Sequence, residues 1–284
     1  MFGYWYPLAL SLIGSGIIGG ISGIVGSCMV LKKQSLLGDA ISHASLPGIV
    51  LSLLLFRDKN PAVLMIGGAV FGALGTALAI LIERTTSLAQ DTILGIILSL
   101  FFGVGLVLIS VVQKCQIADQ SIINKFLFGN ASLLLPVDIA VMCIVSCVIV
   151  GVLVICRKEL IATLFDPLFA HTSGFSLTIV NTIFSTLFVM TIVQGIQMTG
   201  IVLMSSLLIA PATAARQLSN SVGMMCLTAA IIGSFASCLG TLIAFWLRMP
   251  SGPTITILSS LLVVIALLWA PERGILWTKM RDRL

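Results

Sequence analysis

The chain has 284 residues, of which 58% are hydrophobic and only 9% are charged. Soluble proteins carry about 25% charged residues, so this composition excludes an ordinary soluble domain and predicts a polytopic membrane protein. The formal net charge is +5, from 15 Lys and Arg against 10 Asp and Glu residues. Cytoplasmic loops explain this mild basic excess, so no nucleic-acid partner is expected.

Eight apolar stretches are long enough to cross a bilayer, which takes about 20 residues. The run from Asp166 to Arg216 contains no charged residue between its ends, so residues 198–210 are expected to form an additional short or re-entrant helix. Such a segment is tolerated at membrane depth only where protein surrounds it. Residues 1–284 are therefore expected to form one all-α transmembrane domain, with spans at about 8–31, 40–56, 61–82, 92–112, 136–156, 175–195, 222–247 and 254–270.

The distribution of Lys and Arg predicts the orientation, because short loops rich in these residues stay in the cytoplasm. With the N-terminus outside, ten of the 15 cationic residues fall on the cytoplasmic side. The sequence therefore predicts an outside N-terminus and a cytoplasmic C-terminus, provided that residues 198–210 count as a crossing.

Glycine pairs at G-x-x-x-G spacing occur in the first and third predicted spans, and such pairs let helix backbones approach closely. They predict a tightly packed bundle. The spacing alone leaves open whether any pair serves a contact between two copies of the chain. The pairs are Gly16 with Gly20, Gly19 with Gly23, and Gly68 with Gly72.

Asp39 and His43 are the strongest candidate ligands, because they lie in the segment that leads into the second apolar run. Their spacing of four residues places them on one helical face. A carboxylate beside an imidazole suits a divalent cation such as zinc, manganese or ferrous iron. Two ligands do not make a site, but two copies of this helix meeting across a twofold axis would bring together two Asp and two His.

A structural role fits the same two residues, and the spacing leaves both interpretations open. Asp39 would then stabilise a helix N-terminus, and His43 would hydrogen-bond to it. Pro47 adds a detail to the functional interpretation, because it has no N–H to donate to the carbonyl of residue 43 if the helix continues through it. The freed carbonyl of His43 would then face the ion pathway. The remaining histidine, His171, is expected to be a solvated residue in a cytoplasmic loop.

Other candidate ligands and catalytic motifs are weaker. Cys143 and Cys147 share a helical face, but no further ligand is evident, so they are interpreted as small buried residues. The chain contains no phosphate-binding loop, H-E-x-x-H or G-x-S-x-G motif. It is therefore not expected to be an enzyme, and any ATPase that drives it must be a separate chain. Two other functions are alternatives to transport driven by a separate ATPase. One is an ion-coupled secondary transporter, with Asp39 and His43 as a proton relay, and the other is a structural membrane subunit.

Three stretches make the chain resemble the permease subunits of bacterial ATP-binding cassette importers for zinc, manganese and iron. They are SLLGDAISHASLPG at Ser35 to Gly48, GIVLMSSLLIAPATAARQLS at Gly200 to Ser219, and PSGP at Pro250 to Pro253 with APERG at Ala270 to Gly274. The first stretch is highly specific, and the resemblance covers nearly the whole chain.

The resemblance implies a fold similar to that of the vitamin B12 importer permease and a location in the bacterial cytoplasmic membrane. It implies three partners: a second permease copy or paralogue, two cytoplasmic ATPase subunits and an extracytoplasmic metal-binding protein. Asp39 and His43 would contact the transported manganese, zinc or iron, and no permanently bound cofactor is implied.

Two cytoplasmic segments are expected to couple the permease to the ATPases, although ordinary polar connectors would fit the same patterns. In the segment from Pro211 to Val222, Pro211 is expected to break the helix. The other segment, Arg157 to Gly174, is expected to be a loop with a Phe-Asp-Pro turn. The candidate coupling residues are Pro211, Ala212, Thr213 and Arg216 in one segment and Phe165, Asp166 and Pro167 in the other.

Overall fold

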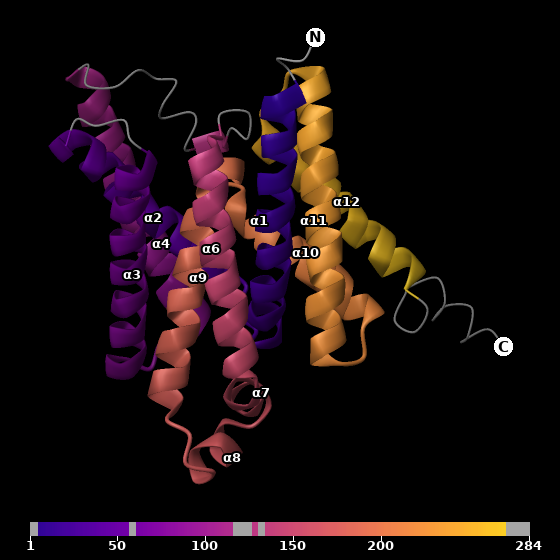
Figure 1. The fold of residues 1–284 in the computed structure, drawn as a ribbon. Coiled ribbons are helices and arrows are strands. Elements are labelled where there is room, and N and C mark those ends of the chain that lie inside the picture. Colours follow the sequence, from indigo (N-terminus) through magenta and orange to yellow (C-terminus); the bar gives the residue numbers. More distant parts are fainter. Residues whose placement is uncertain (1–4, 57–60, 116–126, 130–133, 271–284) are drawn as a thin grey trace.

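The computed structural model describes residues 5–56, 61–115, 127–129 and 134–270. Within these ranges the regular secondary structure is entirely helical, and the long helices form a bundle (Figure 1). Residues 57–60, 116–126, 130–133 and 271–284 lie outside the described residues. They include most of the connections expected at 57–61 and 113–135 and most of APERG.

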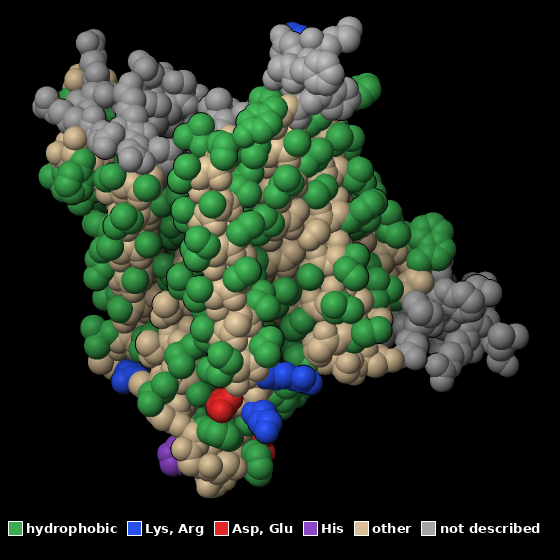
Figure 2. Space-filling view, in the orientation of Figure 1, with side chains coloured by type: hydrophobic (Ala, Val, Ile, Leu, Met, Phe, Trp, Pro, Cys, Tyr) green, Lys and Arg blue, Asp and Glu red, His purple; other side chains and the backbone are tan. Residues whose placement is uncertain are grey.

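Eight described helices are long and apolar enough to cross a membrane, which confirms the eight predicted spans. Exposed apolar side chains cover the visible flank of the bundle, as lipid contact requires (Figure 2). The eight helices are α1 (Trp5–Leu31), α2 (Leu36–Phe56), α3 (Pro61–Thr85), α4 (Gln90–Lys114), α6 (Pro136–Ile155), α9 (Leu177–Thr199), α11 (Val222–Leu247) and α12 (Ser251–Trp269).

Helix α2 begins at Leu36, earlier than the predicted start of the second span at about residue 40. The prediction treated the charge of Asp39 as a boundary of the span. A carboxylate is instead favourable in the first turn of a helix, where it faces the positive end of the helix dipole. Asp39 therefore lies inside the helix that also carries His43.

The short helix expected near residues 198–210 is α10 (Met204–Leu218), which has 15 residues. At 1.5 Å per residue it is roughly 22 Å long, less than the ~30 Å hydrocarbon core. It packs against α1, α11 and α12, so protein surrounds it as predicted. Pro211 lies inside α10 and does not break it. That prediction was wrong, because a helix in a packed bundle tolerates the one backbone hydrogen bond that proline removes.

The expected loop from Arg157 to Gly174 is mostly helical, in two short elements, α7 (Arg157–Phe165) and α8 (Pro167–Thr172). Asp166 separates them, and its Oδ1 accepts a hydrogen bond from the backbone N–H of Phe169 at 2.9 Å. Proline suits the first position of a helix and Asp suits the capping position before it. The Asp-Pro sequence thus starts a new helix.

The α7–α8 end of the bundle, at the bottom of Figure 1, also collects the ends of α1, α9 and α10. Arg216 near the end of α10 donates from Nη1 to the carbonyl of Val30 near the end of α1, at 3.5 Å. Lys32, just after α1, donates to Asn181 near the start of α9. Helix α10 therefore returns the chain to the end of the bundle where α9 began.

The glycine pairs serve contacts within one chain. A Cβ atom at Gly19 would overlap the backbone carbonyl of Gly233, and one at Gly23 would overlap the carbonyl of Ala229, both on α11. Gly68 on α3 similarly faces Ile49 on α2. The predicted tight packing is confirmed for these pairs, which join α1 to α11 and α2 to α3.

Candidate functional site

Asp39 and His43 are partly exposed on a helix that is otherwise largely buried. Asp39 lies in the first turn of α2, and His43 follows one turn later on the same face. The residues around them on the other faces of the helix are buried: Gly38, Ala40, Ile41, Ser42 and Ala44. The two candidate ligands are thus the accessible positions of this part of α2.

The imidazole of His43 is held by α4 and carries an unused nitrogen. The ring of Phe102 meets it edge to face, with ring centroids 4.8 Å apart and an interplanar angle of 73°. The buried Nδ1 atom of His43 has no hydrogen-bond partner among the residues that the structure describes. Buried polar atoms are normally paired, and an unpaired one calls for an explanation such as an ion or water. The His43–Asp39 hydrogen bond of the structural alternative does not occupy this nitrogen.

Helix α2 continues through Pro47 to Phe56. Proline has no N–H, so the helix supplies no i+4 backbone donor to the carbonyl of His43. The carbonyl oxygen of His43 therefore does not accept the usual helical hydrogen bond, and it can accept another donor or bind a cation. Carboxylate and carbonyl oxygens with an imidazole nitrogen form a mixed set that suits borderline divalent metals.

One chain alone does not complete a metal site within the part that the structure describes, because no group of three or more His, Cys, Asp or Glu side chains comes together there. His171 is exposed at the end of α8, in agreement with its predicted solvation. Cys143 and Cys147 are exposed on α6, so their interpretation as buried residues was wrong. They point outward from an apolar helix, where an uncharged thiol is compatible with lipid.

The α7–α8 segment presents apolar side chains at a place where they have no cover within the described chain. Phe165 is 64% exposed, Leu168 77% and Phe169 60%. Figure 1 shows α8 projecting beyond the ends of the long helices, and the charged side chains of Figure 2 gather at this end. Neighbouring exposed apolar side chains rimmed by polar residues mark an interaction site when they form a contiguous patch.

The candidate coupling residues on α10 are less accessible than the sequence suggested. Pro211 and Ala212 are buried, and Thr213 is half-buried, with its hydroxyl donating to the carbonyl of Ala210. Arg216 is the exposed member of the four. Direct contact with a partner at this segment is therefore open to Arg216 and to the connection that follows α10.

Four residues, Phe102, Lys32, Leu168 and Phe169, were missed by reasoning from the sequence. Phe102 and Lys32 became apparent only from tertiary contacts with His43 and Asn181, which no local pattern announces. Leu168 and Phe169 carried a weak signal, since they are apolar residues that follow Asp166-Pro167 in the short segment between two predicted spans.

The chain matches the model of the ABC 3 transport family over residues 6–270. It is 38% identical to "Zinc transport system membrane protein TroC" of Treponema pallidum (strain Nichols), an alignment that covers 98% of this chain and 94% of the relative. It is 35% identical to "Manganese transport system membrane protein MntC" of Bacillus subtilis (strain 168), covering 93% of this chain and 61% of the relative.

A solved structure, "PsaBC from Streptococcus pneumoniae in complex with Fab", is similar to this fold with a TM-score of 0.84. The likeness covers 95% of this chain and 94% of that chain, at 30% sequence identity. The all-helical architecture is thus shared with a solved structure over almost its whole length.

Proposed function

Because the chain belongs to the ABC 3 transport family, we propose that it is the membrane-spanning permease subunit of an importer for a divalent transition metal. The metal, manganese, zinc or iron, would enter the cytoplasm of a bacterial cell by alternating access. Separate ATPase subunits would supply the energy. The observation that carries this proposal is the partly exposed Asp39–His43 pair, with an unpaired imidazole nitrogen, on a buried membrane helix.

A second permease copy or a paralogue would complete the site. A single chain offers Asp39 and His43, and a second α2 brought up to them would add two more ligands. Four nitrogen and oxygen ligands can replace much of the hydration shell of a divalent ion. Because a carboxylate and an imidazole bind zinc, manganese and ferrous iron, selectivity would depend on the geometry of the assembled pair.

Coupling to the ATPase subunits would use the α7–α8 segment as the main docking element. Its exposed apolar side chains, Phe165, Leu168 and Phe169, suit burial against a partner. Asp166 caps α8 and fixes its direction, and Pro167 begins it. The end of α10 would add Arg216, whereas Pro211, Ala212 and Thr213 would act by shaping α10 inside the bundle.

The α7–α8 end would face the cytoplasm. Most of the described Lys and Arg residues lie at this end of the bundle: Lys32, Lys33, Arg84, Arg157, Lys158 and Arg216. Lys114, at the end of α4, and Arg248, after α11, lie at the other end. Short segments rich in Lys and Arg are retained on the cytoplasmic side. The N-terminus would then lie outside, where an extracytoplasmic metal-binding protein would deliver the ion.

The alternative of an ion-coupled transporter assigns the same two residues to proton relay, and membership in the ABC 3 transport family favours ATP-driven import over it. The two functions make opposite predictions about energy. The test is metal uptake into proteoliposomes that hold the permease, its ATPase and its binding protein. ATP-driven import predicts that uptake requires ATP on the face of the membrane that carries the ATPase subunits. Uptake should continue when ion gradients are collapsed.

Asp39→Ala should abolish this uptake, and Asp91→Ala is the matched control, because Asp91 is an exposed carboxylate in the first turn of α4. Uptake by the permease alone that stops when gradients are collapsed would overturn ATP-driven import. Full uptake by Asp39→Ala would remove this carboxylate from the pathway.

A further inference from the structure

Lys32 fastens the connection between α1 and α2 to the start of α9. Its Nζ donates to Oδ1 of Asn181 at 2.8 Å. The same Nζ lies 5.1 Å from the centroid of the Phe184 ring, within the range of a cation–π interaction. A hydrogen bond and an aromatic contact on successive turns of α9 thus hold one ammonium group.

The connection that carries Lys32 is short and has little freedom. Residues 32–35 alone separate α1 from α2. Lys33 adopts a left-handed backbone conformation, with φ of 57°, and the backbone N–H of Gln34 donates to the carbonyl of Met29 at 3.1 Å. Helix α2 begins four residues after Lys32, so a displacement of Lys32 is passed directly to Asp39, which lies in the first turn of α2.

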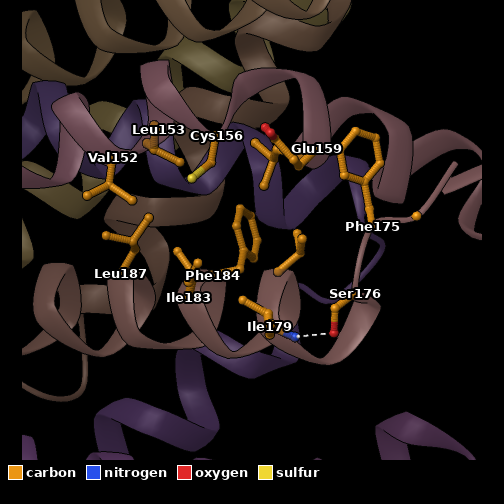
Figure 3. A pocket seen from close by; sticks show the side chains of 13 residues that line it. Val152, Leu153, Cys156, Glu159, Phe175, Ser176, Ile179, Ile183, Phe184 and Leu187 are labelled. Atoms are coloured by element: carbon orange, nitrogen blue, oxygen red, sulfur yellow. Dashed lines mark hydrogen bonds between the residues drawn. The ribbon is translucent and has the colours of Figure 1, made fainter. Parts of the chain in front are cut away.

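The α7 helix reaches the same point from the other side. A small gap between Lys32, α7 and α9 is lined by Leu160, Thr163 and Leu164 of α7 and by Asn181 and Phe184 of α9. Figure 3 shows a larger cavity of about 310 Å³ between the α6–α7 segment and α9, in which Phe184 lies opposite Cys156 and Glu159. Phe184 therefore contributes both to the wall behind α7 and to the surface under the Lys32 ammonium.

Partial burial makes the positive charge of Lys32 unfavourable unless neighbouring groups stabilise it. Burial lowers the pKa of Lys32, and the negative charge of Glu83 on α3 opposes part of that change. Lys32 and Glu83 line one polar cavity of about 300 Å³ between α2, α3, α4 and α9. Long cationic side chains near helix ends normally extend to water, whereas this one is half-buried and lies along α9.

We propose that Lys32 is a positioning residue that transmits movement of the α7–α8 segment and α9 to the Asp39–His43 face of α2. This inference rests on the proposed function, in which α7–α8 docks on the ATPase and α2 holds the metal. When ATP drives α7 and α9, the Lys32 contacts would carry the start of α2 with them. Lys32 would not touch the metal, so its loss should uncouple ATP hydrolysis from transport without removing a ligand.

The test compares Lys32→Met with Lys33→Met in the complete reconstituted complex, because Lys33 is an exposed cation on the next residue. The readout is the ratio of radioactive manganese or zinc taken up to ATP hydrolysed. We expect Lys32→Met to lower this ratio at least about fivefold, the lower end of typical coupling effects. Lys33→Met should leave the ratio unchanged, and Lys32→Arg, which keeps a cation, should restore part of it.

Asn181→Leu provides a second variant that acts on the other partner, at an exposed position that is less prone to misfolding. It should lower the same ratio in a complex that still assembles. An unchanged ratio in both Lys32→Met and Asn181→Leu, or an equal loss in Lys33→Met, would overturn the inference. A wild-type complex that hydrolyses ATP but transports neither metal would instead overturn the proposed function.

Discussion

At the scale of single residues, the unpaired Nδ1 of His43 is the clearest chemical feature of the chain. The ring is oriented by Phe102 from α4, and Asp39 lies one helical turn away. An ionisable side chain inside a membrane segment costs several kcal/mol, so its presence there is by default a sign of function. His43 and Asp39 meet that description on one face of α2.

The sequence was sufficient to predict this pair, because the spacing of four residues in a helix determines that they share a face. It was insufficient for Phe102 and Lys32, which are defined by partners more than 50 positions away in the chain. No periodicity encodes such contacts. The same limit applies to the choice between a structural and a functional His43, which depends on whether its nitrogen has a partner.

Gly23 allows a prediction about how a single substitution changes the free energy of unfolding. Because a Cβ there would overlap the carbonyl of Ala229, Gly23→Ala should force α1 away from α11 and destabilise the protein by about 1–3 kcal/mol, as overpacking does. Thermal unfolding of the purified chain in detergent measures the effect. Gly151→Ala is the control, since a Cβ at Gly151 on α6 would meet nothing within 4 Å.

Both substitutions gain the same intrinsic helix propensity of roughly 1 kcal/mol, so the difference between them isolates the contact with α11. Equal unfolding temperatures for the two variants would show that α1 and α11 are not in close contact.

At the scale of elements, the long helices were predictable because charge-free stretches of about 20 residues have few alternatives to crossing a bilayer. Two elements were predicted incorrectly, each for a different reason. Pro211 remains inside α10 because the surrounding helices stabilise it. The error at α8 has a local cause instead: Asp166 and Pro167 start a helix where the sequence was interpreted as a loop.

Helix α8 makes a prediction about assembly. Leu168 is 77% exposed on a helix that projects from the bundle, so Leu168→Asp should weaken docking of the ATPase by at least about tenfold, a typical cost for an apolar anchor at an interface. Co-purification of the ATPase with the tagged permease measures it. Thr172→Asp adds the same charge at an exposed position of the same helix and should retain the ATPase.

Unchanged recovery of the ATPase with Leu168→Asp would show that α8 is not the docking element. Attention would then move to Arg216 and the connection after α10.

At the scale of the whole molecule, the bundle separates two tasks along its length. The α7–α8 end carries the exposed apolar cluster and most of the described cations, whereas α2 carries the candidate ligands from that end into the apolar part of the bundle. At 1.5 Å per residue, His43 lies roughly 10 Å along α2 from its first residue. The element that would receive the work of ATP is therefore close to the element that would hold the metal.

The assembled site could not be predicted from one chain, because two ligands fall short of a metal cage. In the proposed assembly, the identity of the second α2, from an identical copy or a paralogue, would determine whether the set is two Asp and two His. The geometry of that pair, rather than the ligand types, would select among manganese, zinc and iron.

The most direct test is uptake of radioactive manganese and zinc in competition, by vesicles that carry this chain with its ATPase and binding protein. We predict ATP-dependent uptake of a preferred metal by the wild type and by His171→Ala, and its loss in His43→Ala with the complex still assembled. The loss should exceed the roughly 10- to 100-fold that removal of an outer-shell partner costs a metal site. Undiminished uptake by His43→Ala would contradict the account and place the metal pathway on other residues.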